Sequence, residues 1–407
     1  MTLYPKHLNA ERIARLNNTL TADVERGAIP GAVTLIARRG QLAYLEAVGY
    51  RNREEQLPMA TDSIFRIASM TKPMVSVCVM MLLEEGRIRL VNPISTYLPE
   101  FKNVQVGREV PHATDSKSAP SLVLEAPRRE PSVQDLLRHT SGITYGIFGD
   151  SLVKAQYRAA NMMDREQTSA QMISKLTKLP LQYHPGEVWD YGMSTDVLGC
   201  IVEVVSGMPL DQFIATRITG PLGMKDTGFT VPQSEAYRVA EALIDPATGE
   251  RPPMMVRDLT VRPNFLSGGG GMVSTAPDYL CFAQLLANGG SLDGVRLLAR
   301  KTVALMASDH LPPNVAYSPL ARAQFEESAP MPEMGQGFGL GFCVRKEAGR
   351  NPTPGSVGDF YWSGVFGTYF WIDPTEELIG ILMLCAPEQR RHYRALMRTM
   401  TYQALND

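Results

Sequence analysis

The hydrophobic positions near the N-terminus follow two different periods. Residues 8–27 place apolar side chains three or four positions apart, which predicts an amphipathic surface helix. The apolar runs 32–37 and 42–45 follow, separated by the polar, glycine-containing stretch 38–41, and this pattern predicts a β-hairpin. The N-terminal part of the chain is therefore expected to form a helix and two antiparallel strands.

The C-terminal part of the chain has a similar pattern. Residues 337–344 alternate glycine with larger side chains, as a single strand with one glycine face would. The apolar runs 360–362, 368–372 and 378–384 predict three further strands. Residues 387–405 predict a closing helix.

Helical patterns dominate the middle of the chain. Ser132 and Thr275 each stand three residues before an aspartate and resemble capping boxes at helix starts. The polar, proline-containing stretches 103–131 and 233–263 predict long loops. We find no internal repeat and no low-complexity segment.

These patterns predict an α/β protein of the α+β type in two parts. The strands near both ends should share one antiparallel sheet, flanked by helices, in a domain formed by residues 1–60 and 291–407. Residues 61–290 should form an inserted, mostly helical domain. A cleft between the two is the expected place for an active site.

The composition is that of an ordinary globular protein, with 44% hydrophobic residues, 20% charged residues and a formal net charge of -2. Without a block of Lys or Arg there is no electrostatic basis for binding nucleic acid or a membrane surface. The N-terminal residues contain no apolar signal-peptide core, and no run reaches the roughly 18 apolar residues of a membrane span. We therefore expect a cytoplasmic protein without membrane insertion.

The cysteines and histidines give no indication of a metal site. The five cysteines are far apart and mostly lie in apolar segments, as reduced core residues of an intracellular protein do. The six histidines form no His-x-His or His-Glu-x-x-His pair, and no Cys-x-x-Cys is present. We expect neither a metal nor a cofactor, and a small molecule as the binding partner.

One of two Ser-x-x-Lys matches, Ser69-Met70-Thr71-Lys72, has the context of a nucleophile and its base. Pro73 is tolerated without a kink only in a helix's first turn, so the helix over 74–85 should begin near Ser69, with Lys72 facing the same side. The helix is apolar all round, and burial disfavours the charged lysine. A neutral amine beside a hydroxyl is what proton abstraction requires. The alternative is a helix-capping serine and a snorkelling lysine.

The second match is Ser151-Leu152-Val153-Lys154. Its helix is polar on most sides, so Lys154 should be solvated and charged. Gly149-Asp150-Ser151-Leu152 also spells the signature of the GDSL lipases, but no histidine here has an aspartate three residues before it. We interpret Ser151 as a helix cap.

Three further segments offer possible parts of an active site. No serine lies in a Gly-x-Ser-x-Gly elbow, so Ser69 remains the preferred nucleophile. Tyr191 should lie just before a helix capped by Ser194, where a phenolate is stabilised, although a structural tyrosine is the simpler alternative. The glycines at 268–271 suggest close backbone approach at a cleft wall. His139 would be a structural residue in a last helical turn, with Gly142 as the C-cap.

At this point the sequence resembles a known family. Ser69-Met70-Thr71-Lys72, Tyr191-Gly192-Met193 and Trp362-Ser363-Gly364 are similar in order and spacing to the three motifs of class C β-lactamases and DD-peptidases. The likeness covers about residues 25 to 385, and the family VIII carboxylesterases are the most similar in character. The resemblance implies a β-lactamase-like fold.

The resemblance also implies roles for individual residues. Ser69 would be the acyl-accepting nucleophile, and Lys72 and Tyr191 would share the work of general base and proton shuttle. The backbone N–H groups of Ser69 and Val365 would form the oxyanion hole. Trp362, Ser363, Gly364 and Met193 would contact the substrate.

Two positions depart from the pattern of true β-lactamases. These have asparagine where this chain has Met193, and lysine where it has Trp362. The resemblance therefore implies a serine esterase for short-chain, neutral esters, with weak β-lactam hydrolysis as a possible side activity. An acyltransferase passing the acyl group to an alcohol is the second hypothesis. A β-lactamase or cell-wall peptidase is the third, and a non-enzymatic penicillin-binding sensor the fourth.

Overall fold

Strands from both ends of the chain build a single antiparallel sheet. The computed structural model describes residues 7–111, 120–324 and 330–406. The sheet contains β1 (Gly31–Arg38), β2 (Gln41–Asn52), β3 (Leu57–Pro58), β12 (Gln336–Phe338), β13 (Cys343–Arg345), β14 (Phe360–Ser363), β15 (Tyr369–Asp373) and β16 (Leu378–Leu384). Its spatial order is β12-β13-β14-β15-β16-β1-β2-β3, so β1 joins the N-terminal strands to the C-terminal ones. The predicted shared sheet is confirmed.

The register of β1 explains why this strand is mostly hydrophobic, with Thr34 and Arg38 as its polar residues. It pairs with β16 from Ala32–Leu384 to Arg38–Leu378 and with β2 on its other side, and all of its residues are buried. The predicted hairpin turns at Arg39 and Gly40, whose φ values of 51° and 71° fit the two-residue turns that match the twist of paired strands.

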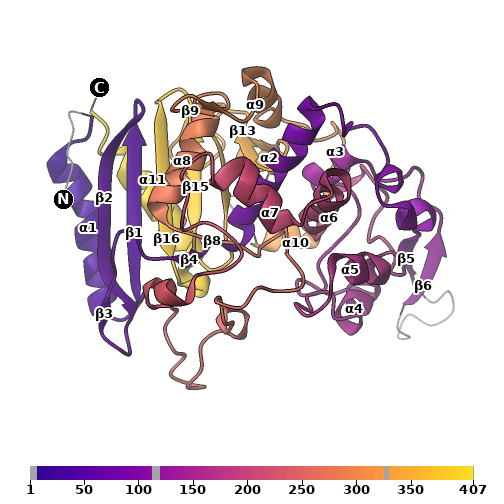
Figure 1. Ribbon diagram of the computed structural model, residues 1–407, viewed down its shortest axis with the longest axis horizontal. Helices are drawn as coiled ribbons and strands as arrows, with labels where there is room; N and C mark the ends of the chain where they lie inside the picture. Colours follow the sequence, from indigo (N-terminus) through magenta and orange to yellow (C-terminus); the bar gives the residue numbers. More distant parts are fainter. Residues whose placement is uncertain (1–6, 112–119, 325–329, 407) are drawn as a thin grey trace.

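Helices cover both faces of the sheet (Figure 1). The helices are α1 (Ala10–Glu25), α2 (Thr71–Glu84), α3 (Val133–Leu137), α4 (Leu152–Ala159), α5 (Ser169–Leu176), α6 (Ser194–Ser206), α7 (Leu210–Ile214), α8 (Ala276–Ala287), α9 (Arg300–Met306), α10 (Pro319–Gln324) and α11 (Arg390–Tyr402). α1 and α11 pack together on one face, against β2 and β16, and α8 packs against β1, β15 and β16. α2 lies between the sheet and the other helices and packs on α6.

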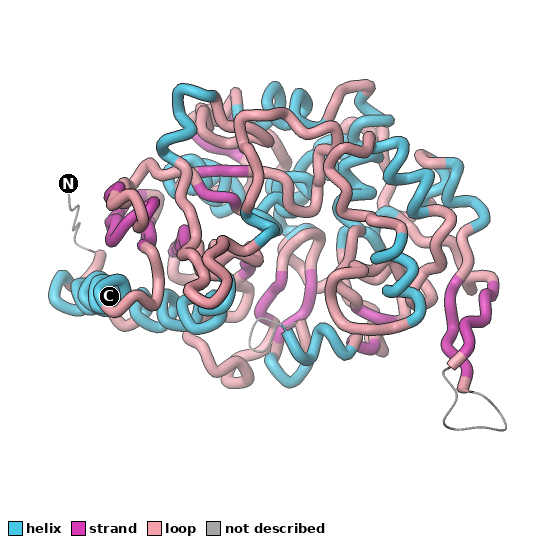
Figure 2. The backbone as a smooth tube through the Cα atoms, turned by 90° about the horizontal axis from the view of Figure 1, so that it is seen from below, coloured by secondary structure: helices cyan, strands magenta, loops and turns pink. Residues whose placement is uncertain are grey.

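Short strand pairs connect the remaining segments. They are β4 (Phe65–Arg66) with β8 (Val273–Ser274), β7 (Val188–Trp189) with β11 (Ala316–Tyr317), β9 (Ser291–Leu292) with β10 (Val295–Arg296), and β5 (Val106–Val110) with β6 (Ser121–Glu125). The hairpin β5–β6 lies within the stretch that we expected to be a loop. It lies at the end of the molecule opposite α1 in both Figure 1 and Figure 2.

One prediction about an element was wrong, and one domain boundary stays a prediction. Residues 337–344 do not form one strand, because Gly341 has a φ of 105° and bends the chain between β12 and β13. The boundary at residue 290 placed α8 with the helical domain, whereas α8 packs on the sheet. We therefore keep the two-domain division as a proposal, with α8 assigned to the sheet domain.

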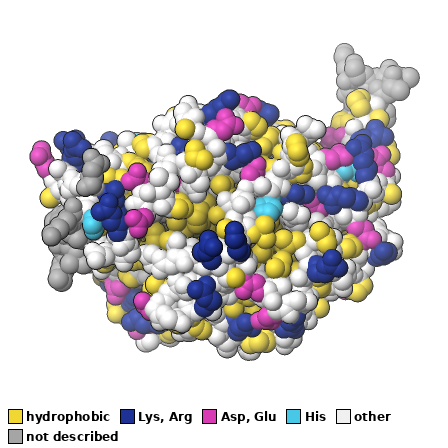
Figure 3. All heavy atoms as spheres, turned by 90° about the horizontal axis from the view of Figure 1, so that it is seen from above, with side chains coloured by type: hydrophobic (Ala, Val, Ile, Leu, Met, Phe, Trp, Pro, Cys, Tyr) yellow, Lys and Arg dark blue, Asp and Glu magenta, His cyan; other side chains and the backbone are white. Residues whose placement is uncertain are grey.

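The charge and thiol distributions are unremarkable. On the face shown in Figure 3, basic and acidic side chains are interspersed.

All five cysteines are unpaired, and four of them are buried. Within the described ranges no group of three or more His, Cys, Asp or Glu side chains could hold a metal ion.

Membrane-spanning potential was assessed for the described helices. Among them, none is by itself long and apolar enough to cross a membrane. α6 and the segment Leu210–Thr219 together pass the same test of length and composition, but the chain bends by 79° between them.

Candidate active site

Ser69 lies in a short turn that leads into the buried helix α2. Ala68–Met70 form one turn of 3-10 helix, and α2 begins at Thr71, so Pro73 is in the first turn as predicted. Ala68 has a φ of 44°, a conformation that costs a non-glycine residue free energy and is held here by its surroundings. The turn is fixed on one side by the bond from Ile67 N–H to Met272 O (3.1 Å).

Lys72 is only 1% exposed, and its amine lies among three oxygen atoms. Its Nζ is 3.2 Å from Ser69 Oγ, 3.2 Å from Tyr145 Oη and 2.6 Å from the carbonyl oxygen of Gly269. The structure therefore brings together the serine and lysine of the first motif. It also adds a tyrosine and a backbone carbonyl to their surroundings.

The glycine-rich segment forms a wall of the site, as its composition indicated. Gly269 N–H donates to Asp196 Oδ1 (3.0 Å), and a Cβ at Gly269 would lie 2.4 Å from Asp196 Oδ2 and 2.9 Å from Tyr145 Oη. Only glycine allows this approach, which carries the Gly269 carbonyl to Lys72.

Tyr145 and Asp196 were not identified from the sequence. Tyr145 is hydrogen-bonded to Asp196, and burial, followed by the charge of Asp196, raises the pKa of Tyr145 well above its usual value. Burial also raises the pKa of Asp196, opposed by the nearby charge of Lys72 and by the hydrogen bond from Ser267. No spacing rule could have found this pair, because Tyr145 lies 73 residues from Lys72 in the chain.

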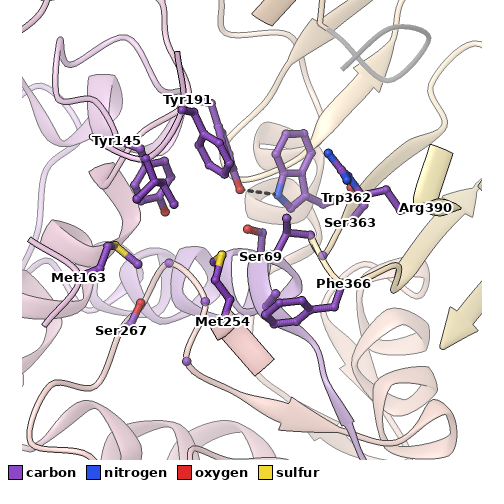
Figure 4. Close-up of a pocket in the computed structure, with 18 of the residues that line it drawn as sticks. Ser69, Tyr145, Met163, Tyr191, Met254, Ser267, Trp362, Ser363, Phe366 and Arg390 are labelled. Carbon is purple, nitrogen blue, oxygen red and sulfur yellow. Dashed lines mark hydrogen bonds between the residues drawn. The ribbon is translucent and has the colours of Figure 1, made fainter. Parts of the chain in front are cut away.

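Tyr191 and Trp362 meet across the cleft, as Figure 4 shows. Trp362 Nε1 donates to Tyr191 Oη (3.4 Å), and Lys72 Nζ lies 4.6 Å from the centre of the Tyr191 ring. Tyr191 lies just before α6, as expected. Ser194 does not cap that helix, because its Oγ is hydrogen-bonded to Ser141 Oγ (2.9 Å) instead.

The prediction for His139 needs a correction. His139 itself takes the left-handed conformation after α3, with a φ of 57°, so Gly142 is not the cap. Its ring is 4.7 Å from that of Tyr191, centre to centre. Burial, and then the charge of Lys72, lowers the pKa of His139 well below its usual value. A neutral imidazole therefore packs behind Tyr191.

Gly364 brings the end of β14 against the residues before Ser69. A Cβ at Gly364 would lie 2.4 Å from Ile67 O and 2.3 Å from Thr368 Oγ1, so glycine is required. Ser69 and Val365 then line the same pocket, together with Ser363 and Gly364. The oxyanion role of the Ser69 and Val365 N–H groups stays a prediction.

Two residues that we considered lie away from this pocket. Met193, expected to contact the substrate, is 1% exposed and packs in the core at the start of α6, so its side chain is not part of the pocket lining. Ser151 caps α4, as predicted, by accepting from Lys154 N–H (3.0 Å). The expectation that Lys154 is solvated was wrong, because this residue of α4 is buried and near Asp190.

The pocket around Ser69 encloses about 1170 Å³ of space that is open to solvent. Apolar side chains form much of its lining: Ile147, Phe148, Met163, Met254, Phe265, Trp362, Val365 and Phe366. Four arginines also line it: Arg165, Arg257, Arg390 and Arg394. A pocket lined in this way suits a largely apolar small molecule.

The fold defines a protein of the β-lactamase-like type. The chain matches the family model described as Beta-lactamase over residues 16–397 and belongs to that family. The resemblance to family VIII esterases of the class C β-lactamase-like superfamily is thereby confirmed, together with the predicted fold.

Individual relatives extend over nearly the whole chain. Esterase EstB of Burkholderia gladioli is 30% identical and covers 92% of this chain and 90% of its own length. Protein Rv1367c of Mycobacterium tuberculosis is 34% identical over 88% of this chain and 86% of its own. The solved structure titled "EstCE1, a hydrolase with promiscuous acyltransferase activity" is 26% identical, with a TM-score of 0.78, and covers 96% of this chain and 99% of its own.

Proposed function

We propose that this protein is a serine carboxylesterase that hydrolyses neutral, short-chain esters through an acyl-enzyme on Ser69. The observation that carries the proposal is the position of the Lys72 amine, held among Ser69 Oγ, Tyr145 Oη and Gly269 O, three residues that line the pocket. The similarity to esterase EstB and to the hydrolase EstCE1 supports an ester as the substrate.

The contacts of Lys72 suit a general base. The Gly269 carbonyl can only accept a hydrogen bond from the Lys72 amine. Tyr145 Oη also accepts one from Lys72 when the tyrosine's own proton is directed to Asp196. A neutral amine would use its two N–H bonds on these oxygens. Its lone pair would then face Ser69 Oγ at 3.2 Å, within reach for proton transfer.

The reaction follows in two steps. Ser69 Oγ attacks the ester carbonyl while its proton passes to Lys72, and the N–H groups of Ser69 and Val365 stabilise the oxyanion. The C–O bond to the alcohol breaks, and Tyr191 delivers a proton to the leaving oxygen, with Lys72 restoring the proton of Tyr191. Water then attacks the acyl-Ser69 ester by the reverse proton path, releasing the acid.

A direct test uses a p-nitrophenyl phosphonate, which labels an activated serine and releases p-nitrophenol. Peptide mass spectrometry should find the adduct on Ser69. An adduct on Ser151, or none while p-nitrophenyl esters are turned over, would contradict the proposal.

Trp362 provides a second test, because an indole cannot replace the lysine charge that binds the carboxylate of a β-lactam in the relatives. A charge-assisted hydrogen bond contributes about 1.5–3 kcal/mol, so kcat/KM for benzylpenicillin should lie at least about tenfold below that for p-nitrophenyl butyrate. Equal values would overturn the proposed preference. If Trp362→Ala leaves the ester kinetics unchanged, Trp362 does not contact the substrate.

Acyl transfer is the second candidate function. The apolar lining beside Ser69 and the promiscuous acyltransferase activity of the hydrolase EstCE1 favour it. The same acyl-enzyme would then pass its acyl group to an alcohol instead of water. Partitioning between acid and ester products in the presence of added alcohols separates the two functions.

A further inference from the structure

The charged side chains that line the substrate pocket all have the same sign. Arg165, Arg257, Arg390 and Arg394 line it, and no aspartate or glutamate does so among the described residues. The chain as a whole is slightly acidic, with 42 acidic and 40 basic residues. The charge of the pocket lining is therefore positive although the chain as a whole is slightly acidic, and this excess of arginines needs an explanation.

Arg165 and Arg257 lie together on one side of the pocket. Arg257 Nη2 donates to Phe229 O (3.0 Å), and Arg165 Nη2 is 3.5 Å from Met254 O, so both guanidinium groups contact backbone carbonyls. Within the described ranges neither forms an ion pair with a carboxylate within 4.0 Å, in contrast to Arg66 nearby, which pairs with Glu241.

The positive charge of Arg165 is unfavourable for Arg257. Burial, and then the charges of Arg165 and Arg66, lowers the pKa of Arg257, and the opposing effect of Asp258 is smaller. Burial followed by the charge of Arg66 lowers the pKa of Arg165. Asp258 is exposed and accepts hydrogen bonds from Thr260, so it does not neutralise the pair. An anion between the two guanidinium groups would relieve this repulsion.

The geometry at Ser69 indicates which part of an ester reaches these arginines. Tyr191 and Trp362 lie on one side of Ser69, and Met163 and Met254 lie away from them, as Figure 4 shows. If Tyr191 protonates the leaving oxygen, the alcohol part of the ester lies on the side of Ser69 that Tyr191 and Trp362 form. The acyl group then extends along Met163 and Met254, the residues that neighbour Arg165 and Arg257 in the chain.

We propose that the acyl pocket selects acyl groups with an apolar chain next to the ester carbonyl and a terminal carboxylate that binds Arg165 and Arg257. The substrate class is then the monoesters of dicarboxylic acids. This inference rests on the proposed function, since it assumes an acyl-enzyme on Ser69. It replaces the neutral, short acyl group of the proposed function by a longer, anionic one, while the alcohol part, which faces Trp362, stays neutral.

The test compares matched p-nitrophenyl esters. One series carries a free ω-carboxylate on acyl chains of five to ten carbons, and the other has the same chains with that carboxylate methylated. At the best chain length, kcat/KM for the substrate with the free carboxylate should exceed that for its methylated counterpart by about tenfold. This is the gain expected from a charge-assisted hydrogen bond to arginine. The excess should shrink as NaCl is raised. A third substrate, 3-carboxy-4-nitrophenyl butyrate, carries the charge on the leaving group and should show no such gain.

Variants assign the effect to residues. Arg165→Gln and Arg257→Gln should each reduce the ratio of carboxylate to methyl-ester kcat/KM severalfold, and the double variant should bring it close to one. Arg350→Gln, which removes an exposed arginine paired with Glu347, is the matched control and should leave the ratio unchanged. A ratio that responds to Arg390→Gln instead would overturn the assignment to Arg165 and Arg257.

The outcomes separate this inference from the proposed function. If neutral esters are hydrolysed with Ser69 labelled but the ratio is near one at every chain length, the carboxylate inference fails and the esterase proposal stands. If no p-nitrophenyl ester is hydrolysed and Ser69 is not labelled, both fail.

Discussion

The two Ser-x-x-Lys segments of this protein have the same spacing but different structures. Ser151 is the N-cap of α4, and its Oγ accepts from Lys154 N–H while donating to Gln182 Oε1 (2.7 Å). Ser69 lies in the 3-10 turn before α2, whose N-cap Met70 makes no side-chain cap. The Oγ of Ser69 is therefore directed to the side chain of its lysine rather than to the lysine's backbone.

The difference arises from where each helix begins. α4 begins directly after Ser151, so the serine hydroxyl accepts a hydrogen bond from an otherwise unpaired N–H group of the first turn. α2 begins two residues after Ser69, and the intervening turn carries the hydroxyl out of the cap position. Both lysines are buried, so burial of the lysine does not by itself distinguish a nucleophile from a cap.

The largest effect should come from removing Ser69 Oγ. Ser69→Ala should lower kcat for p-nitrophenyl butyrate by about 10⁴-fold or more, because the covalent intermediate can no longer form. Steady-state kinetics measures the loss, and circular dichroism checks that the variant is folded. Residual activity above one per cent of wild type, free of contaminating enzyme, would show that another group supplies the nucleophile.

The next largest effect should come from removing Lys72 or Tyr191, which form the proposed proton path at Ser69 and have no counterpart at Ser151. Lys72→Ala and Tyr191→Phe should each lower kcat by about 10²–10⁴-fold, as loss of a general acid–base group does. The double variant should be little worse than either single one, because groups on one path are not additive. Losses that multiply would refute a shared path.

Lys154 should affect stability rather than proton transfer from serine. Burial raises the pKa of Asp190, and the charge of Lys154 opposes this shift. A carboxyl with a raised pKa favours the folded state below its unfolded value near pH 3.9, and this contribution is lost as the pH rises through the folded pKa. Lys154→Met should therefore cost about 1–3 kcal/mol at neutral pH, as leaving a buried polar group uncompensated does, and less at pH 4. Urea unfolding at both pH values measures this, and an equal loss at both would contradict the electrostatic explanation.

The smallest effect is expected for Ser151→Ala. Loss of an N-cap costs about 1 kcal/mol in the free energy of unfolding, and kcat should stay at the wild-type value because Ser151 lies outside the pocket. Thermal unfolding and ester hydrolysis measured on the same preparation check both statements. A large fall in kcat would reopen the assignment of the nucleophile.

The helix and strand patterns were sufficient to predict α1, the β1–β2 hairpin and strands β14 to β16, because each has a long, regular hydrophobic period. The sequence also predicted a helix start within a few residues of Ser69, since Pro73 restricts where the helix can begin. The hairpin β12–β13 was missed because its bend depends on one glycine conformation. Tyr145 and Asp196 could not be predicted, since their contact with Lys72 exists only after distant segments pack. The arginines of the pocket come from three separate segments for the same reason.

The central position of β1 has a consequence for synthesis of the chain on the ribosome. β1 and β2 emerge early, but the partner strand β16 emerges more than three hundred residues later. Until then one edge of the apolar strand β1 has no native strand to pair with, and exposed edges of this kind promote association between nascent chains. Because β14, which carries Trp362, also belongs to the late segment, the pocket around Ser69 can assemble only after that segment has been synthesised.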